Sequence, residues 1–143
     1  MRKWLVISCG VALIWGTFLL HTGGVSSSGL LLASDTQEGL EISADEAAES
    51  LVDGRFDVIL DVRQPEEYEG MHIPGAILIP LNTLEEKARV QLDDPNAHIL
   101  AYCGVGARSL EATKILRKMG YANVLTLKGG IILWKEKGYP VTE

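Results

Sequence analysis

The sequence of 143 residues has few cysteines and histidines and no excess of positive charge. Its two cysteines, Cys9 and Cys103, are too few for a scaffold held together by disulfides. Its three histidines, His21, His72 and His98, form no cluster with the cysteines at the spacing of metal ligands, so no metal site is predicted. The net charge is −6 and there is no basic stripe, which argues against binding to nucleic acid or to anionic lipid headgroups.

The sequence also lacks repeats and low-complexity segments, which excludes a solenoid. Hydrophobic residues make up 47% of the chain and charged residues 22%, close to the average for globular proteins. This composition excludes a disordered or collagen-like chain. The length allows one domain of ordinary size and no second domain of comparable weight.

The first 34 residues differ from the rest. Arg2 and Lys3 form a short positive region, residues 4–20 carry no formal charge, and a stretch rich in glycine and serine comes next. This is the order of an export signal. The apolar run is short for a membrane span, which usually takes about 20 residues. Residues 1–34 are therefore predicted to be either a cleaved signal peptide or an uncleaved N-terminal membrane anchor with a linker; the alternative is a buried core helix.

The position of the two basic residues predicts the compartment. Positive charge ahead of an apolar run keeps the N-terminus in the cytoplasm and places the rest of the chain outside it. We therefore expect an exported protein, periplasmic or membrane-anchored, with residues 35–143 outside the cytoplasm. Contact with a membrane is expected only through the N-terminal segment, if it stays uncleaved.

From residue 35 onward the pattern alternates between strands and helices. Buried strands are predicted at 57–62, 77–79, 98–102 and 124–127, and a short run at 40–42 would add a fifth. Helices are predicted at 44–53, 83–92, from about 109 to 119 and from 129 to 134, with an acidic turn or short helix at 64–70. Ser43 and Glu46 have the spacing of a capping box at the start of the first helix. This alternation predicts an α/β domain with a four- to five-stranded parallel sheet and helices on both faces.

One predicted strand end carries obvious chemistry. Cys103 ends the strand at 98–102, and Gly104, Val105, Gly106 and Ala107 connect it to the next helix. A thiol in this place faces backbone N–H groups and a helix N-terminus, and both lower its pKa by favouring the thiolate. Arg108 adds a permanent positive charge. The loop is therefore interpreted as a nucleophilic thiolate in an anion-binding cradle.

This loop has two other interpretations. A lone cysteine at the end of a buried strand is commonly a small core residue, but the glycines and the arginine after it favour a functional role. The spacing Gly104-x-Gly106-x-x-Ser109 imitates a dinucleotide-binding fingerprint. Its third glycine is missing, and too few residues remain after it to complete such a domain.

Four segments resemble the rhodanese (sulfurtransferase) family. Residues 103–109, Cys-Gly-Val-Gly-Ala-Arg-Ser, are similar to its active-site loop, and residues 61–68 to its D-V-R-x-x-x-E-[FY] segment. Residues 72–76 resemble its G-H-I-P-G-A turn, with Met71 where the family usually has glycine. Residues 127–130, Trp134 and residues 138–141 resemble its closing L-x-G-G…W…G-x-P-V pattern. The resemblance spans about residues 40–141, so a rhodanese-like domain is predicted over 35–143.

The resemblance implies a reaction and a set of site residues. Cys103 corresponds to the nucleophile, which takes a sulfane sulfur from a small anionic donor such as thiosulfate. The resulting persulfide passes the sulfur to cyanide, a thiol or a protein. The substrate-binding residues implied are Gly104, Val105, Gly106, Ala107 and Arg108, with Arg108 binding the anionic tail of the donor. No cofactor is implied, and nothing in the sequence demands more than a monomer.

Two alternatives to this activity stay open. One is a cysteine-dependent phosphatase or arsenate reductase. The loops of these relatives resemble Cys-x5-Arg, whereas here four residues separate Cys103 from Arg108, a shorter loop that favours sulfur. A rhodanese-like binding module without catalysis is the other alternative. Inactive members usually lack the cysteine, so its presence argues against this.

Other candidate residues are predicted to have supporting roles. Asp61 and Arg63 are expected to fix loops through hydrogen bonds and an ion pair, and Ser109 to support the cysteine loop. His72 is expected to anchor a turn, and Trp134 to lie in the core. The acidic residues of the 64–70 segment, Glu66, Glu67 and Glu69, are expected to form a solvated turn.

Overall fold

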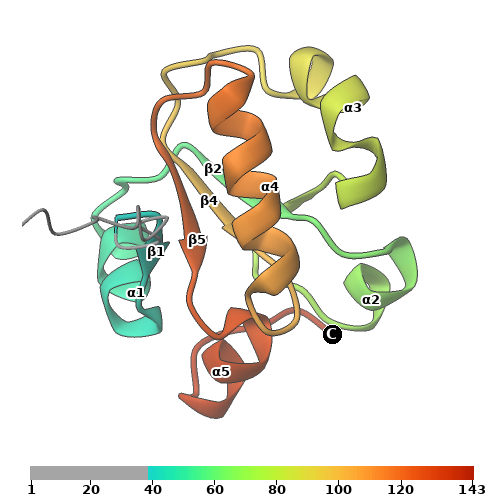
Figure 1. Ribbon diagram of the computed structural model, residues 1–143. Helices are drawn as coiled ribbons and strands as arrows, with labels where there is room; N and C mark the ends of the chain where they lie inside the picture. Colours follow the sequence, from blue (N-terminus) through green and yellow to red (C-terminus); the bar gives the residue numbers. More distant parts are fainter. Residues whose placement is uncertain (1–38) are drawn as a thin grey trace, which may run out of the picture. The chain divides into compact units, whose positions relative to one another are not determined.

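The computed structural model describes residues 39–143, whose five strands form one sheet in the order β1-β5-β4-β2-β3 (Figure 1). The strands are β1 (Glu41–Ile42), β2 (Val58–Asp61), β3 (Ile77–Leu78), β4 (Ile99–Tyr102) and β5 (Val124–Leu127). The helices are α1 (Ala44–Val52), α2 (Pro65–Gly70), α3 (Leu84–Gln91), which comes after the 3-10 turn η1 (Leu81–Thr83), α4 (Ala107–Lys118) and α5 (Gly130–Glu136). Every strand pairing is parallel, and the short strand at 41–42 is formed.

The sheet is buried on both faces, as a parallel sheet with crossover helices must be. All four residues of the central strand β4 are buried. On one face α3 and α4 pack against β2, β4 and β5, and on the other α1 and α5 cover Leu100, Tyr102 and Leu127. Trp134 is 2% exposed, which confirms that it belongs to the core. The predicted α/β architecture is thus confirmed.

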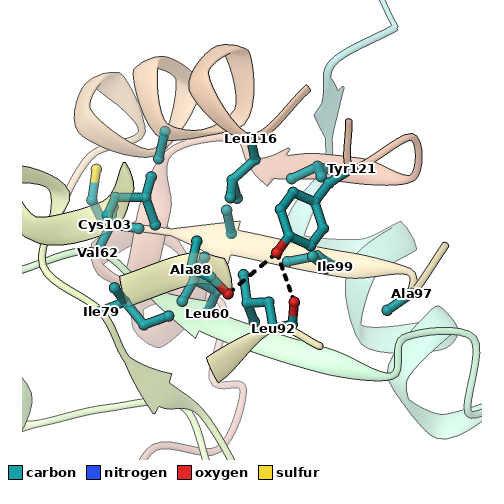
Figure 2. Close-up of a cluster of buried hydrophobic side chains, with 14 residues drawn as sticks. Leu60, Val62, Ile79, Ala88, Leu92, Ala97, Ile99, Cys103, Leu116 and Tyr121 are labelled. Carbon is teal, nitrogen blue, oxygen red and sulfur yellow. Dashed lines mark hydrogen bonds between the residues drawn. The ribbon is translucent and has the colours of Figure 1, made fainter. Parts of the chain in front are cut away.

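The core under α3 and α4 is closed by a tyrosine hydroxyl (Figure 2). Tyr121 is 5% exposed, and its hydroxyl donates to the carbonyl oxygens of Leu92 at 2.6 Å and Ala88 at 3.2 Å. Ala88 lies in α3 and Leu92 directly follows it, so the hydroxyl ties the end of this helix to the segment after α4. Cys103 lies at one end of this cluster.

Local sequence signals explain where several helices begin. Ser43 and Glu46 form the predicted capping box of α1, in which each side chain accepts from the backbone of the other. The 64–70 segment is a helix, because Pro65 suits a first helical turn and Glu67 caps the N–H of Gln64. Helix α4 starts at Ala107, two residues earlier than predicted, because Gly106 turns the chain at a φ of 106°.

The predicted leader, residues 1–34, lies outside the described residues, so the predictions of a signal peptide or anchor stay predictions. None of the helices in residues 39–143 has the length and apolar character needed to cross a membrane.

Candidate active site

The thiol of Cys103 lies at the carboxyl edge of the sheet, directly after β4. Ligands of open parallel sheets bind beyond this edge. Because β4 has a partner on each side, β5 and β2, the residue directly after it is held in the middle of the sheet. Cys103 itself is only 1% exposed.

The loop after β4 wraps around the sulfur atom. The backbone N–H of Gly106 donates to Sγ of Cys103 at 3.1 Å, and the hydroxyl of Ser109 lies 3.6 Å from Sγ. Ser109 is itself fixed, because its Oγ lies 3.1 Å from the carbonyl oxygen of Gly106 and 2.6 Å from Oγ1 of Thr126. Val105 forms the exposed tip of the loop and Ala107 opens α4. The structure therefore brings the six residues 103–108 and Ser109 together.

These contacts determine the acidity of the thiol. Burial raises the pKa of Cys103, but the backbone N–H and the hydroxyl of Ser109, together with the N–H groups of Gly106 and Val105, stabilise the thiolate. These hydrogen bonds outweigh burial, and the pKa of Cys103 lies below its ordinary value. The site thus favours a nucleophilic thiolate.

The start of α5 supports the same loop through its backbone. The N–H of Ile131 donates to the carbonyl of Cys103 at 2.9 Å, and the N–H of Ile132 donates to the carbonyl of Gly104 at 3.2 Å. This approach requires glycine at position 130. Its φ is +60°, and a Cβ there would overlap the carbonyl of Gly104 and lie 2.5 Å from the carbonyl oxygen of Cys103. No such role was predicted for Gly130 from the sequence, although a glycine pair directly after a strand was the signal for it.

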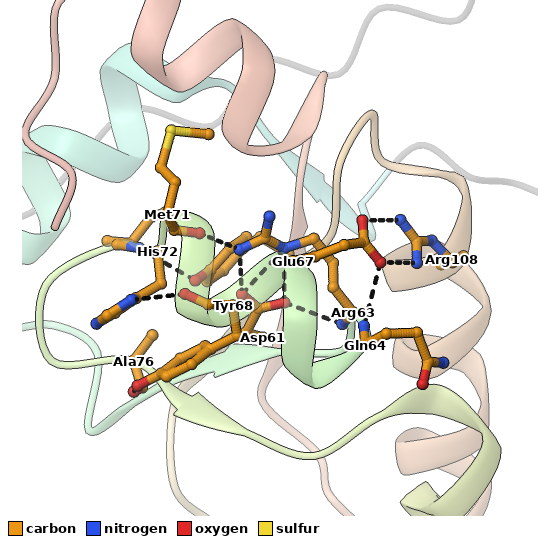
Figure 3. A network of polar contacts seen from close by, with 11 residues as sticks. Asp61, Arg63, Gln64, Glu67, Tyr68, Met71, His72, Ala76 and Arg108 are labelled. Atoms are coloured by element: carbon orange, nitrogen blue, oxygen red, sulfur yellow. Dashed lines mark hydrogen bonds and ion pairs between the residues drawn. The ribbon is translucent and has the colours of Figure 1, made fainter. Parts of the chain in front are cut away.

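Arg108 does not stand free in the structure, because it is held by Glu67 of α2 (Figure 3). Nη1 lies 2.8 Å from Oε2 of Glu67, and Nη2 lies 2.8 Å from Oε1. The prediction of a solvated acidic turn was wrong for Glu67, whereas Glu66 and Glu69 are exposed as expected. The two residues are 41 positions apart, so no local spacing could reveal the pair.

The pair shifts both ionisable groups toward their charged forms. The hydrogen bonds from Arg108 lower the pKa of Glu67 to about 2, against the effect of burial and with help from the N–H of Gln64. In return, Glu67 raises the pKa of Arg108 further above its ordinary range. Both groups are therefore fully charged at any working pH.

Asp61 and Arg63 form a separate buried ion pair, as the sequence predicted. Nη2 of Arg63 lies 2.6 Å from Oδ2 of Asp61, and Nε contacts both carboxylate oxygens at 3.0 Å. Nη2 also donates to the carbonyl of Met71, and the guanidinium lies over the ring of Tyr102. Both residues are buried, so the pair fixes the end of β2 to the turn after α2 (Figure 3).

His72 anchors that turn, as expected. Its Nδ1 lies 2.9 Å from the carbonyl of Tyr68, and its ring stacks on the Tyr68 ring with the centroids 4.0 Å apart. Its backbone pairs in both directions with Thr142. Within residues 39–143, no group of three or more His, Cys, Asp or Glu side chains is arranged to hold a metal ion.

Fold and site together define a parallel α/β domain with a buried cysteine at the carboxyl edge of its sheet, where backbone N–H groups surround the sulfur. Residues 43–137 match the rhodanese-like domain model. The chain therefore belongs to the rhodanese-like family, and the resemblance noted in the sequence is confirmed.

Similar proteins that are named as sulfurtransferases or rhodanese-related agree with this assignment. The chain is 33% identical over 101 residues to a sulfurtransferase of Allochromatium vinosum, which covers 71% of this chain and 92% of that protein. It is 40% identical over 81 residues to the thiosulfate sulfurtransferase PspE of Escherichia coli K12, with coverages of 55% and 78%. The crystal structure of a rhodanese-related protein from Thermoplasma volcanium superimposes with a TM-score of 0.64 at 32% identity, covering 71% of this chain and 96% of that one. These relatives support rhodanese-type sulfur transfer.

Proposed function

We propose that the domain is a sulfurtransferase that moves a sulfane sulfur from a donor such as thiosulfate to a thiophilic acceptor, which is cyanide, a thiol or a protein, through a persulfide on Cys103. The observation that carries the proposal is the set of hydrogen bonds to Sγ, from the Gly106 N–H at 3.1 Å and from the Ser109 hydroxyl. Donors placed in this way stabilise a negative sulfur, whether thiolate or persulfide.

The reaction consists of two balanced displacements. In the first, the thiolate attacks the outer sulfur of thiosulfate; a new S–S bond forms, the S–S bond of the donor breaks, and sulfite leaves with the electron pair. In the second, cyanide attacks the terminal sulfur of the persulfide, thiocyanate leaves, and the Cys103 thiolate is restored. No proton is transferred in either step, so no general base is needed.

The loop residues support this chemistry in different ways. The N–H groups of Val105 and Gly106 would hold the negative charge through both steps. Arg108 would meet the anionic part of the donor, in exchange with its present partner Glu67. Asp61 and Arg63 support the surrounding backbone.

The proposal includes the compartment. The positive, apolar and Gly/Ser-rich order of residues 1–34 supports export, with the domain working outside the cytoplasm. The N-terminal sequence and the fractionation of the mature protein test this point.

The test of the activity is the intact mass of the protein after incubation with thiosulfate and removal of excess donor. We expect a gain of one sulfur atom that cyanide reverses with the appearance of thiocyanate, and no gain in Cys103→Ser. A protein that keeps a titratable thiol but gains no sulfur would contradict thiosulfate as donor. Transfer by Cys103→Ser would contradict the role of Cys103.

A further inference from the structure

We propose that Glu67 determines donor specificity: its carboxylate neutralises Arg108 beside the thiolate loop and thereby makes the site favour donors with one negative charge over dianions such as thiosulfate. This inference rests on the proposed sulfur transfer at Cys103 and deepens it. It names the donor class as monoanionic sulfane-sulfur compounds, such as organic thiosulfonates and organic persulfides.

Glu67 is fixed in place independently of Arg108. Its Oε2 caps the start of α2 by accepting the N–H of Gln64 at 3.1 Å. Pro65, the first residue of that helix, holds the first turn in shape. The carboxylate is therefore a preorganised partner, unlike two flexible side chains that meet by chance on a surface.

The Glu67 carboxylate occupies one whole edge of the Arg108 guanidinium. Both terminal nitrogens of Arg108 are taken, each by one oxygen of Glu67 at 2.8 Å. This two-point contact uses the edge of the guanidinium that binds oxyanions best. A sulfonate group that approaches this edge of the guanidinium must compete with Glu67 for the same two nitrogens.

The pair lies directly at the loop. A Cβ on Gly104 would lie 3.5 Å from Nη2 of Arg108, so the guanidinium lies against the residue next to the nucleophile. Coulombic attraction between Arg108 and Cys103 is among the effects that raise the pKa of Arg108. The charges of Arg108 and Glu67 therefore act together on any donor that approaches the sulfur.

The balance of charge results from these contacts. The thiolate is negative, Arg108 is positive and Glu67 is negative, so this group carries a net negative charge before a donor arrives. The surroundings add no net positive charge. Arg63, whose charge also acts on Glu67, is balanced by its partner Asp61, and Glu66 and Glu69 are exposed on the same short helix as Glu67. A dianion is repelled more than a monoanion of the same size.

The test compares two donors of similar shape, thiosulfate and methanethiosulfonate, which differ by one charge. With the full-length protein and cyanide as acceptor, kcat/KM is measured for each donor. The ratio of thiosulfate to methanethiosulfonate should rise about five- to tenfold in Glu67→Gln. The matched control is Glu66→Gln, which removes the same charge one residue away and should change the ratio less than twofold. Glu67→Asp, which keeps the charge, should stay close to the wild type.

Three outcomes would overturn the inference. An equal loss with both donors in Glu67→Gln would mean that Glu67 only supports the fold of α2 or the loop. An unchanged ratio would mean that Arg108 is not neutralised in the working enzyme. If the ratio of thiosulfate to methanethiosulfonate rose as much in Glu66→Gln as in Glu67→Gln, the effect would come from the overall charge of the protein.

A measurement on the unmodified protein keeps the inference testable if Glu67→Gln does not fold. Salt screens whichever charge dominates at the site. Raising sodium chloride should therefore raise the ratio of thiosulfate to methanethiosulfonate. An unchanged ratio would mean that no net negative charge acts on the donor, and a fall would show that the positive charge of Arg108 dominates; both would contradict the inference. A wild-type protein that takes sulfur from neither donor contradicts the proposed function itself. Activity with both donors but no effect of Glu67 contradicts the inference alone.

Discussion

The backbone N–H of Ile131 lies 2.9 Å from the carbonyl oxygen of Cys103, so the first turn of α5 is attached to the residue that carries the thiol. The same turn holds the next carbonyl, that of Gly104, through Ile132. The loop thus has hydrogen bonds on two sides, with Gly106 and Ser109 donating to the sulfur and α5 donating to the backbone. Its shape depends on a helix that is far from it in sequence.

This relationship predicts the effect of Gly130→Ala. The added Cβ would overlap the carbonyl of Gly104, so the loop and α5 must separate. We expect the free energy of unfolding to fall by about 2–4 kcal/mol, from overpacking together with the strained φ, and sulfur transfer to fall at least tenfold. Chemical denaturation and thiocyanate formation measure the two effects.

The control for this change is Gly138→Ala. Gly138 also has a positive φ, of 82°, but a Cβ there would meet nothing within 4 Å. In the Gly138→Ala variant the free energy of unfolding should fall by only about 1–2 kcal/mol, from backbone strain, and sulfur transfer should be unchanged. Equal activity losses in the two variants would contradict the role given to Gly130.

The acidity of Cys103 predicts a pH profile. The rate of alkylation by iodoacetamide should rise with pH around a midpoint below that of an ordinary free thiol, because the hydrogen bonds lower the pKa of Cys103. Ser109→Ala removes the hydroxyl donor and should move the midpoint upward. An unchanged midpoint in that variant would mean that the hydroxyl at 3.6 Å contributes nothing.

The same shift predicts how stability depends on pH. Because the pKa of Cys103 is lower in the folded chain than in the unfolded chain, ionisation stabilises the fold. This contribution is fully present above the unfolded value and is lost as the pH falls through the folded value. Denaturation at several pH values should show it in the wild type, and Cys103→Ser should lack that part of the pH dependence.

Arg108→Ala should weaken an anionic donor more than a less charged one. Removing the guanidinium leaves the Glu67 carboxylate without its partner at the loop. We expect kcat/KM for thiosulfate to fall about 10- to 100-fold, and the fall for methanethiosulfonate to be smaller. In the double variant with Glu67→Gln, part of the thiosulfate rate should return. Equal losses for both donors would assign Arg108 to loop structure.

Asp61→Asn should destabilise the domain strongly. The substitution leaves the buried guanidinium of Arg63 without its charged partner, at an expected cost of about 3–5 kcal/mol in the free energy of unfolding. Asp53→Asn is the control, because Asp53 pairs with Arg55 at the surface and should cost less than about 1 kcal/mol. Similar losses in both variants would contradict the importance of burial.

The sequence predicted the features that depend on local pattern. The strand at 124–127 has the predicted bounds, because a continuous apolar run between charged or turn residues has few other places to lie. The apolar run of β4 likewise predicted the position of Cys103 directly after it, and the three-residue spacing of Ser43 and Glu46 predicted the capping box of α1. The start of α4 was displaced because the left-handed conformation of Gly106 begins the helix directly after it.

The features that the sequence could not predict depend on contacts between distant segments. Glu67 and Arg108 come from different helices, and neither is unusual in its own surroundings. The need for glycine at position 130 comes from the closeness of another loop, not from the turn in which it lies. Such pairings become visible only when the sheet order β5-β4-β2 places the three segments at one edge.

The burial of Cys103 also limits the shape of any acceptor of the sulfur. With 1% of the residue exposed, a flat protein surface cannot touch Sγ without moving the loop. If the acceptor in the proposed reaction is a protein, it would have to present its thiol on a slender projection, such as an extended tail or a narrow turn. The same burial keeps bulky oxidants away from the sulfur atom.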